Sequence, residues 1–214
     1  MNGSDNATVE DQIDNNGGII SCWSCKGPVL SFVTFCDTCG VIQPPGQSDH
    51  FFRLGLKPTF DVDKEKLDQQ YFHLQRQLHP DRFVSRSPQE RSLSQQQATA
   101  INDAYESLRE PLSRADYLID LLSHDDNSHD RARVNDQALL IESMEMREAL
   151  MGADTLEQID SLLDRAQNDI KLCIETLSKS FSKNDIDNAC KHTIRLKYLK
   201  KLADETRIKK VKFI

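Results

Sequence analysis

The sequence has no excess of basic residues and no long apolar run. Its formal net charge is −7 at pH 7, and residues 1–20 hold four acidic residues and no basic residue. A protein whose main partner is a nucleic acid carries a basic patch, so this balance argues against that class. No apolar segment approaches the ~20 residues that a membrane-spanning helix needs. The composition therefore argues against nucleic acid as the main partner and against a membrane-spanning helix.

The N-terminal segment also lacks the features of a targeting peptide. MNGSDNATVEDQIDNNGG has neither the apolar core nor the basic residues of a secretory signal, and it lacks the arginines of a mitochondrial presequence. We expect residues 1–20 to form a disordered acidic tail and the protein to be intracellular.

Four of the six cysteines form two close pairs. Cys22 and Cys25 are followed, after ten residues, by Cys36 and Cys39. Each pair makes a tight turn that aims two thiolates at one point, and the spacer can form two short strands that bring the turns together. Four thiolates give a closed tetrahedral zinc site, and so short a segment needs a metal to hold it. We predict one structural Zn²⁺ in residues 21–48; a four-thiolate iron site and a redox dithiol pair are the alternatives.

Residues 49–122 are predicted to be helical, with breaks at prolines. Apolar residues recur at helical spacing over residues 67–78, and we predict that this helix stops at His79, because a residue before proline avoids the α region. A second helix has its buried stripe over residues 98–108. We therefore expect two antiparallel helices joined by a loop that presents residues 79–81 at its tip.

These three residues, His79, Pro80 and Asp81, include the residue types of acid–base sites and metal sites. General acid–base chemistry needs a pocket of positioned groups, which the tip of a helical hairpin lacks. No serine or cysteine nucleophile with a recognisable motif lies near them in the sequence, and a metal site would need more ligands. We therefore interpret the tripeptide as a rigid exposed loop, shaped by its proline, and we expect no catalytic residue.

A polar linker over residues 123–135 precedes a predicted three-helix bundle over residues 136–214. A metal site in the linker sequence HDDNSHD is conceivable, but a solvated loop is the better interpretation. The apolar stripe over residues 155–182 has the spacing of an antiparallel bundle, and Cys173 lies on it as a buried filler. The predicted fold is therefore all-α, preceded by a small zinc-ribbon-like module.

The first bundle helix, predicted over residues 136–151, has two apolar faces. At 100° per residue, one set of residues falls within about 60° and suits a bundle core. That set is Leu139, Ser143, Met146 and Leu150. Leu140, Ile141 and Met144 fall about 100°, 200° and 140° from Leu139 and form a second patch with charged neighbours. Such a patch is typical of a partner-binding surface, but a helix buried on both sides gives the same pattern.

Several motifs together resemble a known family. Tyr71 on a long helix, then LHPDRF, then INDAYESLREPLSRADYL, resembles a J-domain. REPLSRADYLIDLL followed by IESMEMREAL is similar to the HscB co-chaperones of iron–sulfur cluster assembly, which have Jac-type relatives. CWSCKGP and FCDTCGVIQPP resemble the zinc-bearing variants of that family. The resemblance covers residues 21–210 and implies a J-domain over residues 49–122.

The resemblance implies two partners and no enzymatic activity of the chain itself. In that family the His-Pro-Asp loop binds a 70-kDa heat-shock chaperone of the HscA type and stimulates its ATPase, and the C-terminal bundle binds the cluster scaffold IscU. The implied chaperone-binding residues are Arg76, His79, Pro80, Asp81 and Arg82. The implied scaffold-binding residues are Leu140, Ile141, Met144, Glu145, Arg147, Glu148 and Tyr198. The implied location is the bacterial cytoplasm, or the mitochondrial matrix if the chain is eukaryotic and a presequence is missing.

Two other functions remain as alternatives. A zinc-ribbon protein with a helical tail could bind nucleic acid, but Lys26 is the only basic residue in residues 21–48, which leaves no footprint for phosphates. A general J-domain protein would deliver unfolded clients to its chaperone. Specific binding of IscU separates that class from the HscB co-chaperones.

Overall fold

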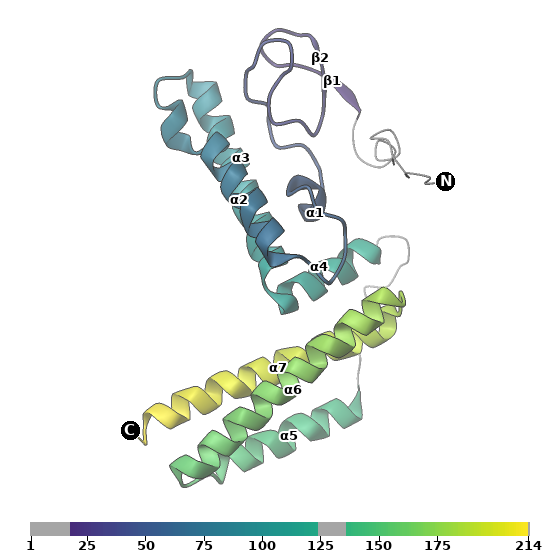
Figure 1. Ribbon diagram of the computed structural model, residues 1–214, viewed down its shortest axis with the longest axis vertical. Helices are drawn as coiled ribbons and strands as arrows, with labels where there is room; N and C mark the ends of the chain where they lie inside the picture. Colours follow the sequence, from purple (N-terminus) through teal and green to yellow (C-terminus); the bar gives the residue numbers. More distant parts are fainter. Residues whose placement is uncertain (1–17, 124–135, 214) are drawn as a thin grey trace, which may run out of the picture. The chain divides into compact units, whose positions relative to one another are not determined.

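The computed structural model describes residues 18–123 and 136–213, and within them the chain is mostly helical (Figure 1). The elements are β1 (Ile19–Ser21), β2 (Pro28–Leu30), α1 (His50–Arg53), α2 (Lys64–Leu78), the 3-10 helix η2 (Pro80–Phe83), α3 (Pro88–Arg109), α4 (Pro111–Leu122), α5 (Gln137–Met151), α6 (Leu156–Ser182) and α7 (Ile186–Val211). The predicted all-α class is confirmed. Residues 124–135 of the predicted linker and residues 1–17 of the predicted tail lie outside the described residues. Ile19 and Ile20, which the prediction placed in the tail, lie in β1.

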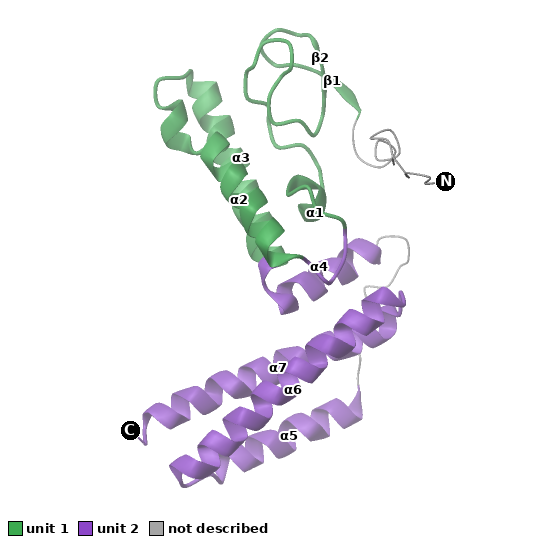
Figure 2. Cartoon of the chain, viewed as in Figure 1, with its two compact units in different colours: residues 1–57, 63–108 green, residues 58–62, 109–214 purple. Residues whose placement is uncertain are grey.

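The chain divides into two compact units (Figure 2). One comprises residues 1–57 and 63–108, and the other comprises residues 58–62 and 109–214. Helix α4 therefore belongs with the C-terminal helices, although it lies within the J-domain predicted from the sequence. Which segments fold independently is a separate property, so the domain boundaries at residues 48, 122 and 135 stay predictions.

In the first unit, α2 and α3 are antiparallel neighbours (Figure 1). The carboxylate of Asp63 caps α2 by accepting a hydrogen bond from the backbone N–H of Lys66. This bond gives a partner to one of the N–H groups that have none within the first turn of a helix. At the other end of this pair of helices, Ser94 on α3 donates to the carbonyl oxygen of Leu78. Leu67 and Leu78 are buried, as their helical spacing predicts.

In the second unit, α5, α6 and α7 form the predicted three-helix bundle. Helix α6 begins with a capping box, in which Thr155 and Gln158 each accept a hydrogen bond from the other's backbone N–H group. The core joins Leu150 of α5, Ala166 of α6, and Leu202 with Ala203 of α7.

Cys173 lies within this bundle and behaves as the sequence predicts. Its side chain is fully buried, and burial raises the pKa of its thiol to about 11. A thiol with so high a pKa stays protonated near neutral pH and is a poor nucleophile. The interpretation of Cys173 as an apolar filler is confirmed.

Two ion pairs attach α4 to α7 in the second unit. Lys197 Nζ lies 2.8 Å from Asp116 Oδ1, and Lys200 Nζ lies 2.9 Å from Glu110 Oε2, just before α4 begins. Both pairs are partly exposed, so each contributes little stability by itself. They still show that α4 packs along the middle of α7.

Candidate metal centre and binding surfaces

The two cysteine pairs form two turns of the same construction. In the first turn, the backbone N–H of Cys22 donates to the carbonyl of Gly27 at 2.8 Å. In the second, the N–H of Cys36 donates to the carbonyl of Val41 at 2.9 Å. The residue after each second cysteine has a positive φ, 63° at Lys26 and 71° at Gly40. Glycine adopts that angle without strain, and lysine does so at a cost that a bound metal can offset.

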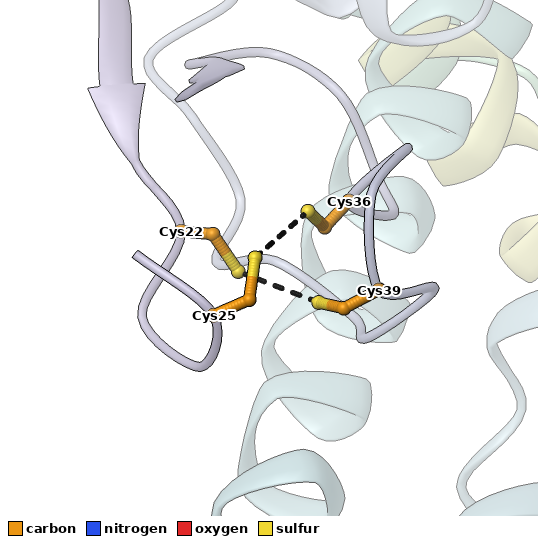
Figure 3. Close-up of side chains that lie close together, drawn as sticks. All are labelled: Cys22, Cys25, Cys36 and Cys39. Carbon is orange, nitrogen blue, oxygen red and sulfur yellow. Dashed lines mark hydrogen bonds between the residues drawn. The ribbon is translucent and has the colours of Figure 1, made fainter. Parts of the chain in front are cut away.

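Between these turns the four Sγ atoms converge on one point (Figure 3). All four lie within 4.8 Å of one another, and the pairs Cys22–Cys39 and Cys25–Cys36 are each separated by 3.8 Å. Four sulfurs held at ~2.3 Å from a tetrahedral zinc ion would be about 3.8 Å apart. The cysteines are therefore positioned to hold a metal ion. A redox dithiol needs only two of them, so the convergence of all four favours a metal over that alternative.

The thiols of this cluster differ in acidity. Burial raises the pKa of Cys22, but hydrogen bonds from backbone N–H groups, chiefly that of Cys25, outweigh it and bring the pKa to about 6. A backbone hydrogen bond at Val41 lowers the pKa of Cys39, yet burial and the neighbouring thiols raise it to about 12. Four thiolates this close repel one another, and a divalent cation would offset that repulsion.

The strands differ from the prediction. We expected the ten-residue spacer to supply both strands, but β1 lies before Cys22 and only β2 lies in the spacer. They pair antiparallel, with Ile19 opposite Leu30, so the strands enclose the first cysteine turn. A single bridge between Phe35 and Ile42 encloses the second turn in the same way. A C-x2-C turn reverses the chain, so its flanking residues pair with each other.

The His-Pro-Asp segment is exposed and is more regular than the predicted loop. His79 caps the 3-10 helix η2, and Pro80 and Asp81 are its first two residues. His79 Nδ1 accepts a hydrogen bond from the N–H of Asp81 at 3.3 Å, and the carbonyl of His79 accepts from the N–H of Arg82 at 2.9 Å. The side chains of His79 and Asp81 are 53% and 86% exposed. The segment is thus a fixed turn that presents its polar side chains to solvent.

The other two predicted chaperone-binding residues lie beside this turn. Arg82 Nη1 donates to the carbonyl of Arg76 at 3.2 Å, so the two arginines meet across the end of α2. Both are exposed. Phe83, the last residue of η2, is buried and anchors the turn. All five predicted chaperone-binding residues therefore lie in or next to one turn.

The second apolar patch of α5 lies at the surface of the second unit. Leu140, Ile141 and Met144 are 43%, 49% and 61% exposed, whereas Leu139 and Leu150 on the same helix are each 7% exposed. The helix is therefore buried on one side only. The alternative of a helix buried on both sides is excluded within this structure.

A bidentate ion pair holds α5 against α7. Arg195 Nη2 lies 2.6 Å from Glu142 Oε1, and Arg195 Nε is 3.0 Å from Glu142 Oε2. The hydrogen bonds to Glu142 raise the pKa of Arg195. A planar fork of this kind fixes orientation as well as distance. It sets the rotation of α5, and with it the direction in which the patch faces.

Tyr198 and Arg147 share a small pocket at the junction of α5 and α7. Its lining also includes Ser143, Met146 and Lys201. Tyr198 is 38% exposed, and the stripe of α7 that faces the core lies on its other side. The structure thus brings together two predicted scaffold-binding residues that are 51 positions apart in the sequence.

The remaining members of that predicted set, Glu145 and Glu148, are exposed on α5 and flank the apolar patch in sequence. Arg147 also lies 3.8 Å from Glu205 of α7, a weak and exposed pairing that leaves its guanidinium accessible. The patch therefore has the polar rim that a protein-binding surface carries.

Sequence reasoning missed one polar residue of the metal centre. Gln43 follows the second cysteine turn and is only 2% exposed. Its Nε2 donates to Cys22 Sγ at 3.3 Å and to the carbonyl of Val41 at 3.1 Å. Contacts of this kind orient metal ligands. No pattern in the sequence marks Gln43 as buried, because it follows an irregular segment with no periodicity.

Comparison with known proteins decides the family. Residues 135–207 match the family model described as the HSCB C-terminal oligomerisation domain. The human iron-sulfur cluster co-chaperone protein HscB is 32% identical over 198 residues, which cover 89% of this chain and 82% of the human protein. This chain belongs to the HscB family. It is an iron–sulfur cluster co-chaperone, as the sequence motifs indicated.

Two further comparisons agree with that assignment. The crystal structure of human HscB superposes with a TM-score of 0.82 at 31% identity, covering 89% of this chain and 98% of that one. The HscB homologue of Shewanella sp. (strain ANA-3) is 38% identical over 169 residues, covering 75% of this chain and 96% of the homologue. The Shewanella protein is thus matched along nearly its whole length by three quarters of this chain. No helix within residues 18–123 and 136–213 is long and apolar enough to cross a membrane.

Proposed function

We propose that this HscB-family chain binds the cluster scaffold IscU on the outer face of α5 and α7, and activates a 70-kDa chaperone of the HscA type through the His79 turn. The observation that carries the scaffold site is the contrast along one helix. Leu140, Ile141 and Met144 stay exposed on α5, while its other side packs into the bundle core. Burying such a patch against a partner supplies the apolar contact that dominates many interfaces.

Charge supports the same assignment of the scaffold surface. Glu145, Arg147 and Glu148 surround the apolar patch with both signs of charge. Charged rims select partners and orient them more than they add affinity. Tyr198 adds an aromatic anchor at the edge, a residue type enriched among the strongest contacts of interfaces.

The chaperone site rests on the exposure and rigidity of the His79 turn. Its backbone is closed by hydrogen bonds, so little conformational entropy remains to be lost when a partner binds. A chain with these two sites raises the effective concentration of scaffold at the chaperone.

A general J-domain protein would have the turn without the scaffold site. Calorimetric titration of the chain with purified IscU, and with an unfolded client protein as comparator, tests this difference: specific IscU binding supports the proposal, and equal binding of both contradicts it.

We also propose that Cys22, Cys25, Cys36 and Cys39 hold one Zn²⁺ with a structural role. Four sulfur ligands leave no open position for substrate, which is the pattern of structural zinc. Nucleic acid is a poor alternative ligand for this module. The ammonium group of Lys26, the one basic side chain of the module, donates a hydrogen bond to the carbonyl oxygen of Trp23 at 3.0 Å.

Replacing both Cys22 and Cys25 with serine should abolish zinc binding. We expect the wild-type chain to hold about one zinc ion and the double variant to hold none, because two remaining thiolates cannot close the site. Elemental analysis of the purified proteins measures the zinc, and far-UV circular dichroism should show that the helices persist.

The matched control for this experiment is Ser24→Ala, a change at an exposed position of the same turn that removes no sulfur. It should keep its zinc. Full zinc retention in the double cysteine variant would contradict the assignment of the ligands.

The place of action is part of this proposal. We expect the chain to work in the compartment that holds both the scaffold and the chaperone. This compartment is the bacterial cytoplasm or, for a eukaryotic chain, the mitochondrial matrix. Fractionation of the host cell with an antibody against the chain measures this directly.

A further inference from the structure

Gln43 connects the metal centre to helix α3. Its side chain donates to Cys22 Sγ, and its own carbonyl oxygen accepts a hydrogen bond from Gln97 Nε2 at 3.0 Å. Gln97 lies on α3 and is 4% exposed, so this hydrogen bond is shielded from water. Buried hydrogen bonds of this kind fix position, because breaking one leaves a buried polar group without a partner. The metal-binding module is therefore attached to α3 at a defined point.

Ser94, one turn before Gln97 on α3, makes the second contact. It is fully buried, and its hydroxyl donates to the carbonyl oxygen of Leu78 at 2.7 Å. Leu78 is the last residue of α2. In a continuing helix its carbonyl would accept from Arg82, but the N–H of Arg82 donates to His79 instead. Ser94 thus supplies a hydrogen-bond donor for the carbonyl oxygen of Leu78, the residue that precedes the His-Pro-Asp turn.

We propose that the metal-bound module braces the His-Pro-Asp turn through α3, with Gln97 and Ser94 as positioning residues. These two side chains are three residues apart and so lie on the same face of one helix. A metal that holds Cys22 in place also holds Gln43, because the Gln43 side chain donates to Cys22 Sγ. Gln43 in turn holds Gln97 on α3, close to Ser94, which contacts the end of α2. This gives the module a role in the positioning of the turn. The effect on the turn follows from these contacts alone, whereas any effect on the chaperone rests on the proposed function.

The proposal predicts that removing the metal loosens a turn that contains no metal ligand. Hydrogen exchange at the amide of Arg82 reports the turn, because that N–H donates to the carbonyl of His79 at 2.9 Å. We expect chelation of zinc to speed this exchange by about fivefold or more, the effect of losing one buried hydrogen bond. The amide of Leu74, in the interior of α2, serves as the reference and should change much less.

Two variants test the path without touching the cysteines. Gln97→Glu replaces the amide donor that faces the Gln43 carbonyl with a carboxylate of the same shape, and Ser94→Ala removes the hydroxyl that faces Leu78. Both variants should keep their zinc. In both, the amide hydrogen of Arg82 should exchange as fast as it does in the chelated wild type. Chelating either variant should add little, because contacts in one path are not additive. Gln95→Glu, at an exposed position of α3, is the matched control and should resemble the wild type.

Chaperone stimulation, measured on the same proteins, separates this proposal from the proposed function. In one outcome His79→Gln loses stimulation, and chelation does not change hydrogen exchange at Arg82. This outcome would support the proposed function and contradict the proposal that the metal-bound module braces the turn. Faster Arg82 exchange on chelation, in a protein whose His79→Gln variant still stimulates fully, would support the brace and contradict the function.

Within the exchange experiment, the expected result is faster exchange at Arg82 in the chelated wild type and in Gln97→Glu, with no further increase when both changes are combined. Three results would overturn the brace. They are unchanged exchange at Arg82 on chelation, equal acceleration at Leu74, and additive effects of chelation and Gln97→Glu. The chelation arm needs no variant to fold, so the test stands even if a substitution unfolds the protein.

Discussion

Replacing His79 with glutamine is expected to remove stimulation of the partner chaperone's ATPase while leaving the fold unchanged. The side chain is 53% exposed, and its Nδ1 atom accepts a hydrogen bond from the N–H of Asp81 and lies 3.5 Å from the Asp81 carboxylate. The side-chain oxygen of glutamine can take over that role, so the free energy of unfolding should change little. The imidazole itself is removed from the surface that meets the chaperone. We expect stimulation to fall by at least about tenfold, which corresponds to the loss of ~1.4 kcal/mol of interaction.

The measurement is single-turnover ATP hydrolysis by the chaperone at several concentrations of the co-chaperone, with circular dichroism as the check on folding. Glu106→Gln, at an exposed position of α3 in the same unit, is the control and should stimulate like the wild type. Unchanged stimulation by a folded His79→Gln variant would show that the turn is not the activating site.

Truncating Leu140, Ile141 and Met144 to alanine together is expected to abolish tight scaffold binding with a small loss of stability. These side chains are exposed, so their removal opens no cavity in the core. Central apolar anchors contribute ~2 kcal/mol or more each, so the affinity for IscU should fall by at least about 100-fold. Titration calorimetry measures the affinity, and urea denaturation measures the stability.

The other side of the same helix supplies the matched control. Leu139 and Leu150 are buried, and Met146 packs against the core cluster. Replacing these three with alanine should cost ~2–5 kcal/mol for each fully buried side chain and unfold the bundle. If both triple variants lose the same stability, the patch on α5 contributes to folding and the proposed scaffold surface is wrong.

Helix positions and the convergence of the four cysteines could be predicted from the sequence because both depend on short-range patterns. Pro80 ends α2, and the spacing of the cysteines predicts their convergence. The two faces of α5 followed from an angle of 100° per residue, and the exposure of Met144 confirms that geometry. Whether these residues bind a partner does not follow from periodicity, so that role stays a proposal.

Contacts between distant segments could not be predicted in this way. The hydrogen bond between Gln43 and Gln97 joins residues 54 positions apart, and neither residue type indicates burial. Gln97 does lie four residues from Ile101 on the buried stripe of α3, and a polar residue at such a position is a usable signal. The ion pair between Asp116 of α4 and Lys197 of α7 joins residues 81 positions apart, so no short-range pattern in the sequence predicts it.

The most direct test of whether one chain links scaffold binding to chaperone activation is the ATPase rate of the chaperone. The chaperone's ATPase rate is measured with the wild-type chain, with and without added IscU, and again with the α5 patch truncated to alanine. We predict that IscU raises the rate further with the wild type, whereas the truncated chain gives only the stimulation that it produces alone. An IscU effect of equal size with both proteins would contradict the account, because scaffold would then reach the chaperone without the surface on α5 and α7.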